Sequence, residues 1–235
     1  MIRYTYLMID LLSLAVPLIF SFHPQIKLYK HWNALLPSIL MVALGYTVWD
    51  SFFTKLGIWG FNPSYLTGVH LCNLPIEEIL FFICIPYSCV FTFECLAPII
   101  SVAFPQSSAR IINYAFAGIF ILIAVVFHSR LYTASAFGLL SVLIFAGALL
   151  NTAWLAKFYL IYAVLLIPFL IVNGLLTGTG LSSPVVWYNP TGIIGPRILT
   201  IPVEDIFYGM GLILANVWLY MALRSREWLK KRILS

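Results

Sequence analysis

Long apolar stretches separated by short polar segments constrain this chain more than any other feature. A helix needs about 20 predominantly apolar residues to cross the hydrocarbon core of a bilayer. Stretches of this kind lie at 4–22, 34–53, 75–99, 111–127, 134–150, 158–176 and 202–223. Only 9% of the residues are charged, whereas soluble domains carry about 25%. We therefore predict an all-α integral membrane protein with about seven transmembrane helices.

The basic residues indicate the orientation of these helices, because Lys and Arg concentrate in cytoplasmic loops. An outside N-terminus leaves only Arg3, Lys55, Arg130 and Arg197 on the outer side. The cytoplasmic side then receives Lys27, Lys30, Arg110, Lys157 and the basic segment after Leu223. We predict a multi-pass protein of the cell (inner or cytoplasmic) membrane with a cytoplasmic C-terminus. The apolar start lacks a basic region and cleavage site, so we expect the first helix to be retained.

Two long loops, at about 54–74 and 177–201, resemble each other. Phe61-Asn62-Pro63 in the first loop matches Tyr188-Asn189-Pro190 in the second. Each Asn-Pro is followed, without a gap, by an apolar stretch and a Pro-x-Glu-acidic motif. The two motifs are Pro75-Ile76-Glu77-Glu78 and Pro202-Val203-Glu204-Asp205. Both loops are too apolar for disordered linkers, and we expect them to fold back over the membrane face.

This match predicts an internal repeat that surrounds one site. We expect two parallel three-helix repeats, 1–105 and 133–235, joined by a linker helix within 106–132. The linker helix restores the orientation of the second copy, so that both motifs reach the same membrane face and can line one cavity. Upstream of the motifs, Asp50 has a rough counterpart in Asn173.

The Pro-x-Glu-acidic motif has a structural and a functional interpretation. Pro in the first turn and acidic residues near the N-terminus are typical of a stable helix start. However, four of the eight acidic residues lie in these motifs, and apolar sequence follows at once. Burial and a neighbouring carboxylate both disfavour the charged form of a carboxyl group. Such pairs can divide into a protonated acid and an ionised base, so the candidate catalytic residues are Glu77, Glu78, Glu204 and Asp205.

Other polar and aromatic residues near these motifs have two interpretations each. Asp10 either approaches the site or forms a packing hydrogen bond, whereas Glu94 belongs to the opposite end of its helix. His70 and Arg197 either pair with carboxylates or face water. The nearby aromatic residues form an interfacial belt, or those beside the two Asn-Pro pairs stabilise a carbocation through their ring faces. These aromatic residues are Trp49, Phe52, Phe53, Trp59, Phe61, Tyr65, Trp187 and Tyr188.

Several function classes lack their signatures in this sequence. It contains no Gly-x-Gly-x-x-Gly fingerprint, no Walker loop and no Asp-rich motif for a diphosphate and magnesium. The last helix has no central lysine for a retinal Schiff base. The four cysteines, Cys72, Cys84, Cys89 and Cys95, show neither metal-ligand spacing nor a disulfide framework. We predict no cofactor, no metal and no nucleic-acid partner.

In their order, these motifs resemble the membrane-type lycopene cyclase family of bacteria, archaea and fungi. The resemblance rests on Asp50, the segment 56–62, the segment 173–177 and the two Pro-x-Glu-acidic motifs. It implies a fused form of two halves that are separate subunits in other members. It also implies a cofactor-independent isomerase that closes β-ionone rings on lycopene, giving γ-carotene and β-carotene. The residues it implies to be essential are Pro75, Glu77, Glu78, Pro202, Glu204 and Asp205.

From this resemblance we expect both Glu77 and Glu204 to be needed, with Glu78 and Asp205 tuning them. The residues expected to orient the carboxyl groups or support the substrate are Asp50, Asn62, Asn173, Asn189, Trp49, Trp59, Phe61 and Tyr188. The expected partners are a lipophilic carotenoid that enters from the bilayer, with other carotenoid-pathway enzymes as further candidates. Two alternatives stay open: a cyclase of prenyl-extended (C50-type) carotenoids and a proton-coupled transporter. The product and the repeat that supplies the acid also stay open.

Overall fold

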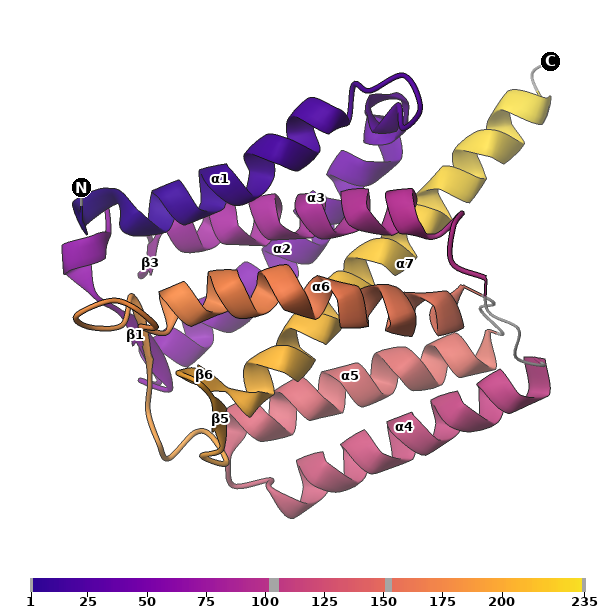
Figure 1. Ribbon diagram of the computed structural model, residues 1–235. Coiled ribbons are helices and arrows are strands. Elements are labelled where there is room, and N and C mark those ends of the chain that lie inside the picture. Colours follow the sequence, from indigo (N-terminus) through magenta and orange to yellow (C-terminus); the bar gives the residue numbers. More distant parts are fainter. Residues whose placement is uncertain (1, 102–105, 151–153, 234–235) are drawn as a thin grey trace. The chain divides into compact units, whose positions relative to one another are not determined.

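The computed structural model describes residues 2–101, 106–150 and 154–233 (Figure 1). Seven α-helices account for most of this described part, which confirms the predicted all-α class. They are α1 (Thr5–Phe20), α2 (Trp32–Lys55), α3 (Ile76–Leu96), α4 (Gln106–Val126), α5 (Leu131–Leu149), α6 (Leu155–Leu176) and α7 (Val203–Ile233). Short 3-10 helices lie at η1 (Ile2–Tyr4), η2 (Leu28–His31) and η3 (Pro63–Tyr65). The predicted end of the first repeat, residue 105, lies outside the described residues.

Among the described residues, six helices are long and apolar enough to cross a membrane, namely all except α1. Helix α1 is apolar but has 16 residues, which gives a length of about 24 Å. The hydrocarbon core is about 30 Å thick. The seventh membrane span therefore stays a prediction.

Helix α7 continues past Leu223, where the last apolar stretch was predicted to end, as far as Ile233. Hydropathy marks where apolar sequence ends, but it does not mark where the backbone leaves the helical conformation. The residues that follow are rich in Arg, Lys, Glu and Leu, which are good helix formers.

The chain divides into two compact units. The first unit contains Met1–Phe52, Pro63–Cys95 and Leu212–Ser235. The second unit contains Phe53–Asn62 and Leu96–Gly211. Helices α2 and α7 each contribute residues to both units, so neither unit corresponds to one half of the sequence.

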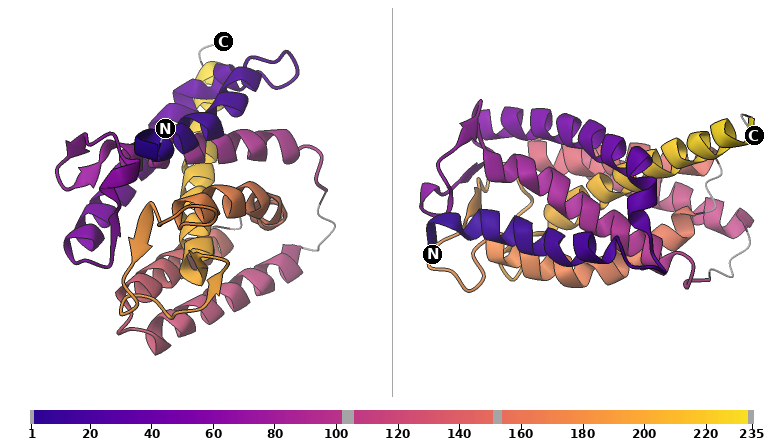
Figure 2. Two further views of the ribbon diagram at one scale, coloured as in Figure 1. Left: turned by 60° about the vertical axis from the view of Figure 1, so that its left-hand side comes forward. Right: turned by 90° about the horizontal axis from the view of Figure 1, so that it is seen from above.

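In the second unit, α4 and α5 run side by side as a helical hairpin (Figures 1 and 2). Small residues allow the two helices to approach closely, since a Cβ added at Gly138 would lie 3.9 Å from the Cβ of Ala124. The hydroxyl of Ser141 also donates to the carbonyl of Ala117 over 2.7 Å. Small residues and hydroxyl–carbonyl bonds are typical of helix packing in membranes.

Both long loops are folded, and each ends in a two-stranded hairpin that leads directly into a helix. Strand β2 (His70–Leu71) pairs with β3 (Leu74–Pro75) before α3, and β5 (Arg197–Ile198) pairs with β6 (Ile201–Pro202) before α7. The tight turns place Cys72 and Leu199 at φ 57° and φ 55°. A positive φ is uncommon for residues other than glycine, so the two turns share an unusual backbone conformation.

A third two-stranded sheet, within the second unit, joins the segments that precede the two Asn-Pro pairs. Strand β1 (Trp59–Phe61) is antiparallel to β4 (Val186–Tyr188), with Gly60 opposite Trp187. The sheet is extended reciprocally, since Asn62 N–H donates to the carbonyl of Val185 and Asn189 N–H donates to that of Ile58, each over 2.8 Å. A Cβ at Gly60 would lie 2.4 Å from the Trp187 ring, so this close approach favours glycine.

Candidate active site

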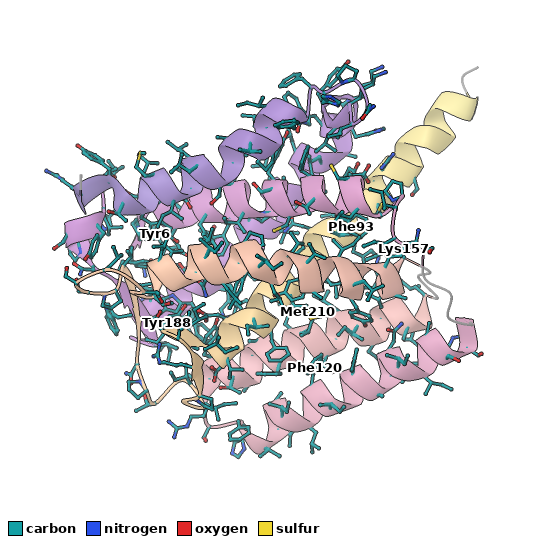
Figure 3. The ribbon with its side chains drawn as sticks, viewed as in Figure 1. Tyr6, Phe93, Phe120, Lys157, Tyr188 and Met210 are labelled. Carbon is teal, nitrogen blue, oxygen red and sulfur yellow. The ribbon has the colours of Figure 1, made fainter. Side chains whose placement is uncertain are left out.

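The first acidic motif lies in the first unit, at the start of α3. Glu77 is fully buried and Glu78 is 8% exposed. Glu77 Oε1 accepts a hydrogen bond of 2.6 Å from the backbone N–H of Thr67. Glu78 Oε2 accepts one of 2.5 Å from the hydroxyl of Tyr6, a buried residue of α1 (Figure 3). Both carboxyl groups are therefore held away from solvent by donors from other elements.

The second acidic motif lies in the second unit, at the start of α7. Glu204 is fully buried. Its Oε1 accepts two hydrogen bonds, one of 2.6 Å from the backbone N–H of Ile194 and one of 2.7 Å from the hydroxyl of Thr133. The other oxygen, Oε2, is buried without a hydrogen-bond partner among the described residues, and the same is true of Glu77 Oε2.

Asp205, the neighbour of Glu204, accepts three side-chain hydrogen bonds. The hydroxyl of Tyr132 donates to Oδ1 over 2.6 Å, and the Asn173 amide donates to Oδ2 over 2.7 Å. The hydroxyl of Tyr188 also donates to Oδ2, over 2.9 Å. Hydrogen bonds from three donors offset part of the cost of burying this carboxyl group, which is only 4% exposed.

The same backbone frame holds Glu77 and Glu204. Each accepts from an N–H ten residues earlier in the chain. A glycine with positive φ follows that donor in both cases, Gly68 at φ 91° and Gly195 at φ 115°. Pro75 and Pro202 then occupy matching positions opposite His70 and Arg197 in the two hairpins. The hairpins thus position the two glutamates in the same way.

Two further acidic residues lie near the first motif. Asp10 is fully buried in α1, one helical turn beyond Tyr6, and interacts electrostatically with Glu78 and Glu77. Asp50, 2% exposed in α2, acts electrostatically on Tyr6. We call Asp10, Asp50, Glu77 and Glu78 the first acidic cluster, and Glu204 with Asp205 the second acidic cluster.

Aromatic rings surround Asp205 in the second unit, where Tyr188 is labelled in Figure 3. Trp59 is buried and contacts Tyr132 and Tyr188 edge-on, with ring centroids 5.0 and 6.3 Å apart. Tyr208 packs edge-on against Tyr132 at 5.7 Å, and Phe53 stacks on Trp59 at 5.0 Å. We call these five residues the aromatic cluster.

The predicted supporting residues lie in several different parts of the structure. Asn173, Trp59 and Tyr188 lie at the second acidic cluster or in the aromatic cluster. Phe61 lies in β1 opposite Val186. Trp49 packs against Tyr46 within α2.

Asn62 and Asn189 extend the β1–β4 sheet through their backbone and side chains. The Asn62 amide donates to the hydroxyl of Ser183 over 3.0 Å, and the Asn189 amide donates to the carbonyl of Gly57 over 3.2 Å. A role for these two amides at the carboxyl groups stays a prediction.

Sequence reasoning missed the donors Tyr6, Tyr132 and Thr133. They lie about seventy residues away from the carboxyl groups to which they donate, in helices outside the repeated motifs. A signal was available, since each lies near the start of the first helix of a predicted repeat. Extending the match between the halves upstream at the same offset would have brought Tyr6 opposite Thr133, the neighbour of Tyr132.

Among the remaining polar candidates, Arg197 has its guanidinium 5.9 Å from the centroid of the Tyr188 ring, which belongs to the aromatic cluster. His70 and Arg197 are exposed, and each has a ring or guanidinium nitrogen within hydrogen-bonding distance of a backbone carbonyl. Glu94, at the far end of α3, forms an ion pair of 2.6 Å with Arg224 within the first unit. Glu94 therefore has a structural partner of its own.

These features define a class: an all-α protein whose described part has six helices long and apolar enough to cross a membrane, with two buried acidic clusters. The family model described as "Lycopene cyclase" matches residues 3–96 and 129–223, and the chain belongs to that family.

A curated relative has a related description. The "Bifunctional lycopene cyclase/phytoene synthase" of Pyrenophora tritici-repentis (strain Pt-1C-BFP) is 35% identical to this chain over 51 residues. The match covers 21% of this chain and only 9% of the relative's length. No solved structure matches the chain.

Proposed function

We propose that this protein cyclises the linear ends of lycopene by acid–base catalysis inside a membrane. One observation carries the proposal: in a chain of the lycopene cyclase family, two buried Pro-x-Glu-acidic motifs are held by matching backbone frames. Buried carboxyl groups in membrane helices are costly and mark functional sites by default.

The reaction needs one proton delivered and one removed. A carboxyl group gives its proton to the terminal double bond of the carotenoid, which leaves a tertiary cation. The nearby internal double bond attacks this cation and closes a six-membered ring. A carboxylate then removes a ring proton and forms the β-ring. Because the product is an isomer of the substrate, the stoichiometry requires no redox cofactor.

The aromatic cluster supports this chemistry by providing electron-rich ring faces. A cation within about 6 Å of the face of a Trp or Tyr ring is attracted by the ring's quadrupole. Trp59 and Tyr132 are both buried, so water competes little with this interaction. The proposed role of the cluster is to stabilise the positive charge that develops on the substrate.

The finer features of the proposal concern the membrane and the chain. We infer two parallel repeats joined by α4, α1 as the seventh membrane helix, an N-terminus outside and a cytoplasmic C-terminus. The matching hairpins support the repeats, and the distribution of Lys and Arg supports the orientation. A carotenoid is too apolar to arrive through water, so it enters laterally from the bilayer, and two successive cyclisations give γ-carotene and then β-carotene.

Expression in a lycopene-accumulating bacterium tests the proposed function. We expect the red colonies to turn orange or yellow, with monocyclic and bicyclic carotenoids separated by chromatography. If the colonies stay red although the protein is present in the membrane, the proposal is wrong. A substrate that is moved across the membrane unchanged in a proton gradient would instead indicate a proton-coupled transporter, and cyclisation of prenyl-extended chains alone would indicate a C50-type enzyme.

The acid–base roles predict the effect of removing either buried glutamate. Glu77→Gln and Glu204→Gln should each lower cyclisation at least about 100-fold, because general acid–base groups contribute about 10²–10⁴-fold. The measurement is carotenoid converted per amount of membrane protein. Glu94→Gln is the control, since Glu94 lies on the same helix as Glu77 but pairs with Arg224. Full activity in both Gln variants would refute the assignment.

A further inference from the structure

Each hairpin that precedes an acidic motif turns through two residues, Cys72-Asn73 in the first unit and Leu199-Thr200 in the second. The first residue of each turn has a positive φ. This backbone conformation is unfavourable for a residue with a side chain, and it persists where the surrounding structure holds it in place. In both hairpins, the second residue of the turn supplies such a hold.

In the second unit, the hydroxyl of Thr200 lies between two other hydroxyl groups. Its Oγ1 is 2.7 Å from Oγ1 of Thr177 and 2.6 Å from Oγ1 of Thr179. The Thr177 hydroxyl donates to the carbonyl of Asn173 over 2.8 Å. Since a hydroxyl group has one hydrogen to donate, Thr177 accepts from Thr200. The hydroxyl of Thr200 then accepts from Thr179. We call Thr177, Thr179 and Thr200 the threonine chain.

The threonine chain joins the hairpin turn to the end of α6, beside a residue of the candidate site. Asn173 lies in the last turn of α6, and its amide donates to Asp205 over 2.7 Å. Thr200 lies at the other end of the connection, shortly before Glu204 in the sequence. The same helix end therefore holds both the turn that leads into the second acidic motif and a carboxyl group of that motif.

The first unit connects its turn to the end of α2 through different side chains. The Ser51 hydroxyl donates to Asn73 Oδ1 over 2.5 Å, and the Asn73 amide donates to the Ser51 carbonyl over 2.8 Å. Ser51 directly follows Asp50 of the first acidic cluster. Asn73 and Thr200 occupy matching turn positions. Unlike side chains thus make the same connection, which indicates that the connection itself is required.

Building on the proposed function, we infer that Thr200 and Asn73 are positioning residues for the two acidic motifs. Each connects its hairpin turn to the long helix that precedes the loop, and the hairpin leads directly into the motif. The connection limits how far the start of the next helix can shift. Because a small displacement of a reacting group can lower a rate greatly, these residues act on the reaction through Glu204 and Glu77.

Replacing Thr200 by Val and by Ser separates the effect of its hydroxyl from that of its shape. Val keeps the branched side chain but interrupts the threonine chain, whereas Ser keeps the hydroxyl. We expect Thr200→Val to lower kcat about 10-fold, with KM changed little, because the motif is held less firmly. The pH profile of kcat should also shift. Thr200→Ser should recover most of the loss, and unchanged kcat in Thr200→Val would overturn the inference.

Thr92→Val is the matched control for the loss of a threonine hydroxyl. The Thr92 hydroxyl donates to the carbonyl of Ser88 over 2.9 Å, within α3 and away from the start of that helix. We expect kcat and its pH profile to stay unchanged in this variant. Equal losses in Thr200→Val and Thr200→Ser, or the same loss in Thr92→Val, would indicate general destabilisation and would overturn the inference.

Two milder variants extend the test. Thr179→Val removes only the first donor of the threonine chain, and it replaces Thr200→Val if that variant does not fold. Ser51→Ala removes one of the two hydrogen bonds of Asn73 and leaves the turn sequence intact. Each should lower kcat about 3-fold, as expected for one hydrogen bond between neutral groups. Unchanged kcat would overturn the inference for the hairpin concerned.

Amide hydrogen exchange distinguishes a failure of this inference from a failure of the proposed function, because it reports local opening without any turnover. The N–H of Ile194 donates to Glu204, and that of Val203 donates to the carbonyl of Pro196. Both should exchange faster in Thr200→Val than in the wild type. Equal exchange would overturn the inference even where cyclisation is seen. A wild-type protein that converts no carotenoid would overturn the proposed function.

Discussion

Two tyrosine hydroxyl groups hold the carboxylate of Asp205 from different elements. Tyr132 belongs to α5 and Tyr188 to β4, and their rings are stacked with centroids 5.9 Å apart. Each ring therefore contributes a donor to the carboxylate and an aromatic surface beside it. At the scale of single residues, the same side chains hold a candidate catalytic carboxylate and, in the proposed mechanism, stabilise the substrate cation.

Removing one of these hydroxyl groups should lower the activity without abolishing it. A hydrogen bond to a charged group is worth about 1.5–3 kcal/mol, so Tyr132→Phe and Tyr188→Phe should each lower kcat about 10- to 100-fold. The rings remain, and membrane levels should change little. Tyr159→Phe is the matched control, because its hydroxyl donates to Asn113. Equal activity in all three variants would contradict the role of these donors.

The carboxylates stand out in the sequence, whereas composition and local motifs do not reveal their donors. Glu77, Glu78, Glu204 and Asp205 stand out because acidic residues are rare in this chain and repeat at matching places. Tyrosine is common here, with 13 copies, and composition does not distinguish Tyr132 from the others. Only tertiary packing brings its hydroxyl to Asp205, so local patterns carry no information about this contact.

At the scale of elements, the hairpins decide where the two glutamates meet their backbone donors. Ile76 N–H donates to the carbonyl of Val69, and Val203 N–H donates to that of Pro196, over 3.0 and 3.1 Å. These bonds tie the first residue of each helix to the start of its hairpin. The glycine just before each hairpin, Gly68 or Gly195, has a positive φ that turns the backbone into the hairpin.

Replacing either glycine by alanine should lower both the stability of the protein and its turnover. Gly68→Ala and Gly195→Ala place a Cβ at φ values of 91° and 115°, at a cost on the order of 1–2 kcal/mol. The relaxed loop should move the N–H of Thr67 or Ile194 away from its glutamate. Thermal unfolding in detergent and carotenoid conversion are the measurements. Gly118→Ala, in α4 with no atom near its added Cβ, should be tolerated, and a similar loss there would refute the argument.

Breaking the ion pair between Glu94 and Arg224 should affect the stability of the protein but not its products. It joins α3 to the later part of α7 within the first unit, with side chains 18% and 36% exposed. A pair of this exposure is worth up to about 1 kcal/mol. Arg224→Gln should therefore lower the melting temperature slightly and leave the carotenoid products unchanged. A changed product pattern would indicate that this pair belongs to the site.

At the scale of the whole molecule, hydropathy predicted the all-α class and the approximate position of every helix. It could not predict the two compact units, because α2 and α7 each contribute to both. It also could not predict the β1–β4 sheet. A strand of three residues has a recognisable conformation, but its partner lies far away in the chain, and only the folded structure identifies it.

That sheet predicts how the chain behaves when it is divided. Residues 1–105 carry β1 and residues 106–235 carry β4, so each piece alone lacks a strand partner. We expect neither piece alone to cyclise lycopene, and co-expression of both to restore conversion. Pigment analysis in a lycopene-accumulating bacterium is the measurement. Conversion by either piece alone would show that the strand pair and the missing acidic cluster are dispensable.

The reciprocal bonds of β1 and β4 also bear on the history of the chain. Asn62 and Asn189 make the same backbone bond from opposite ends of the sheet, as two copies of one polypeptide do about a two-fold axis. A gene encoding a single half would already have specified this self-complementary strand. A duplication of that gene, which the proposed repeats imply, would need to supply only the connection between the two halves.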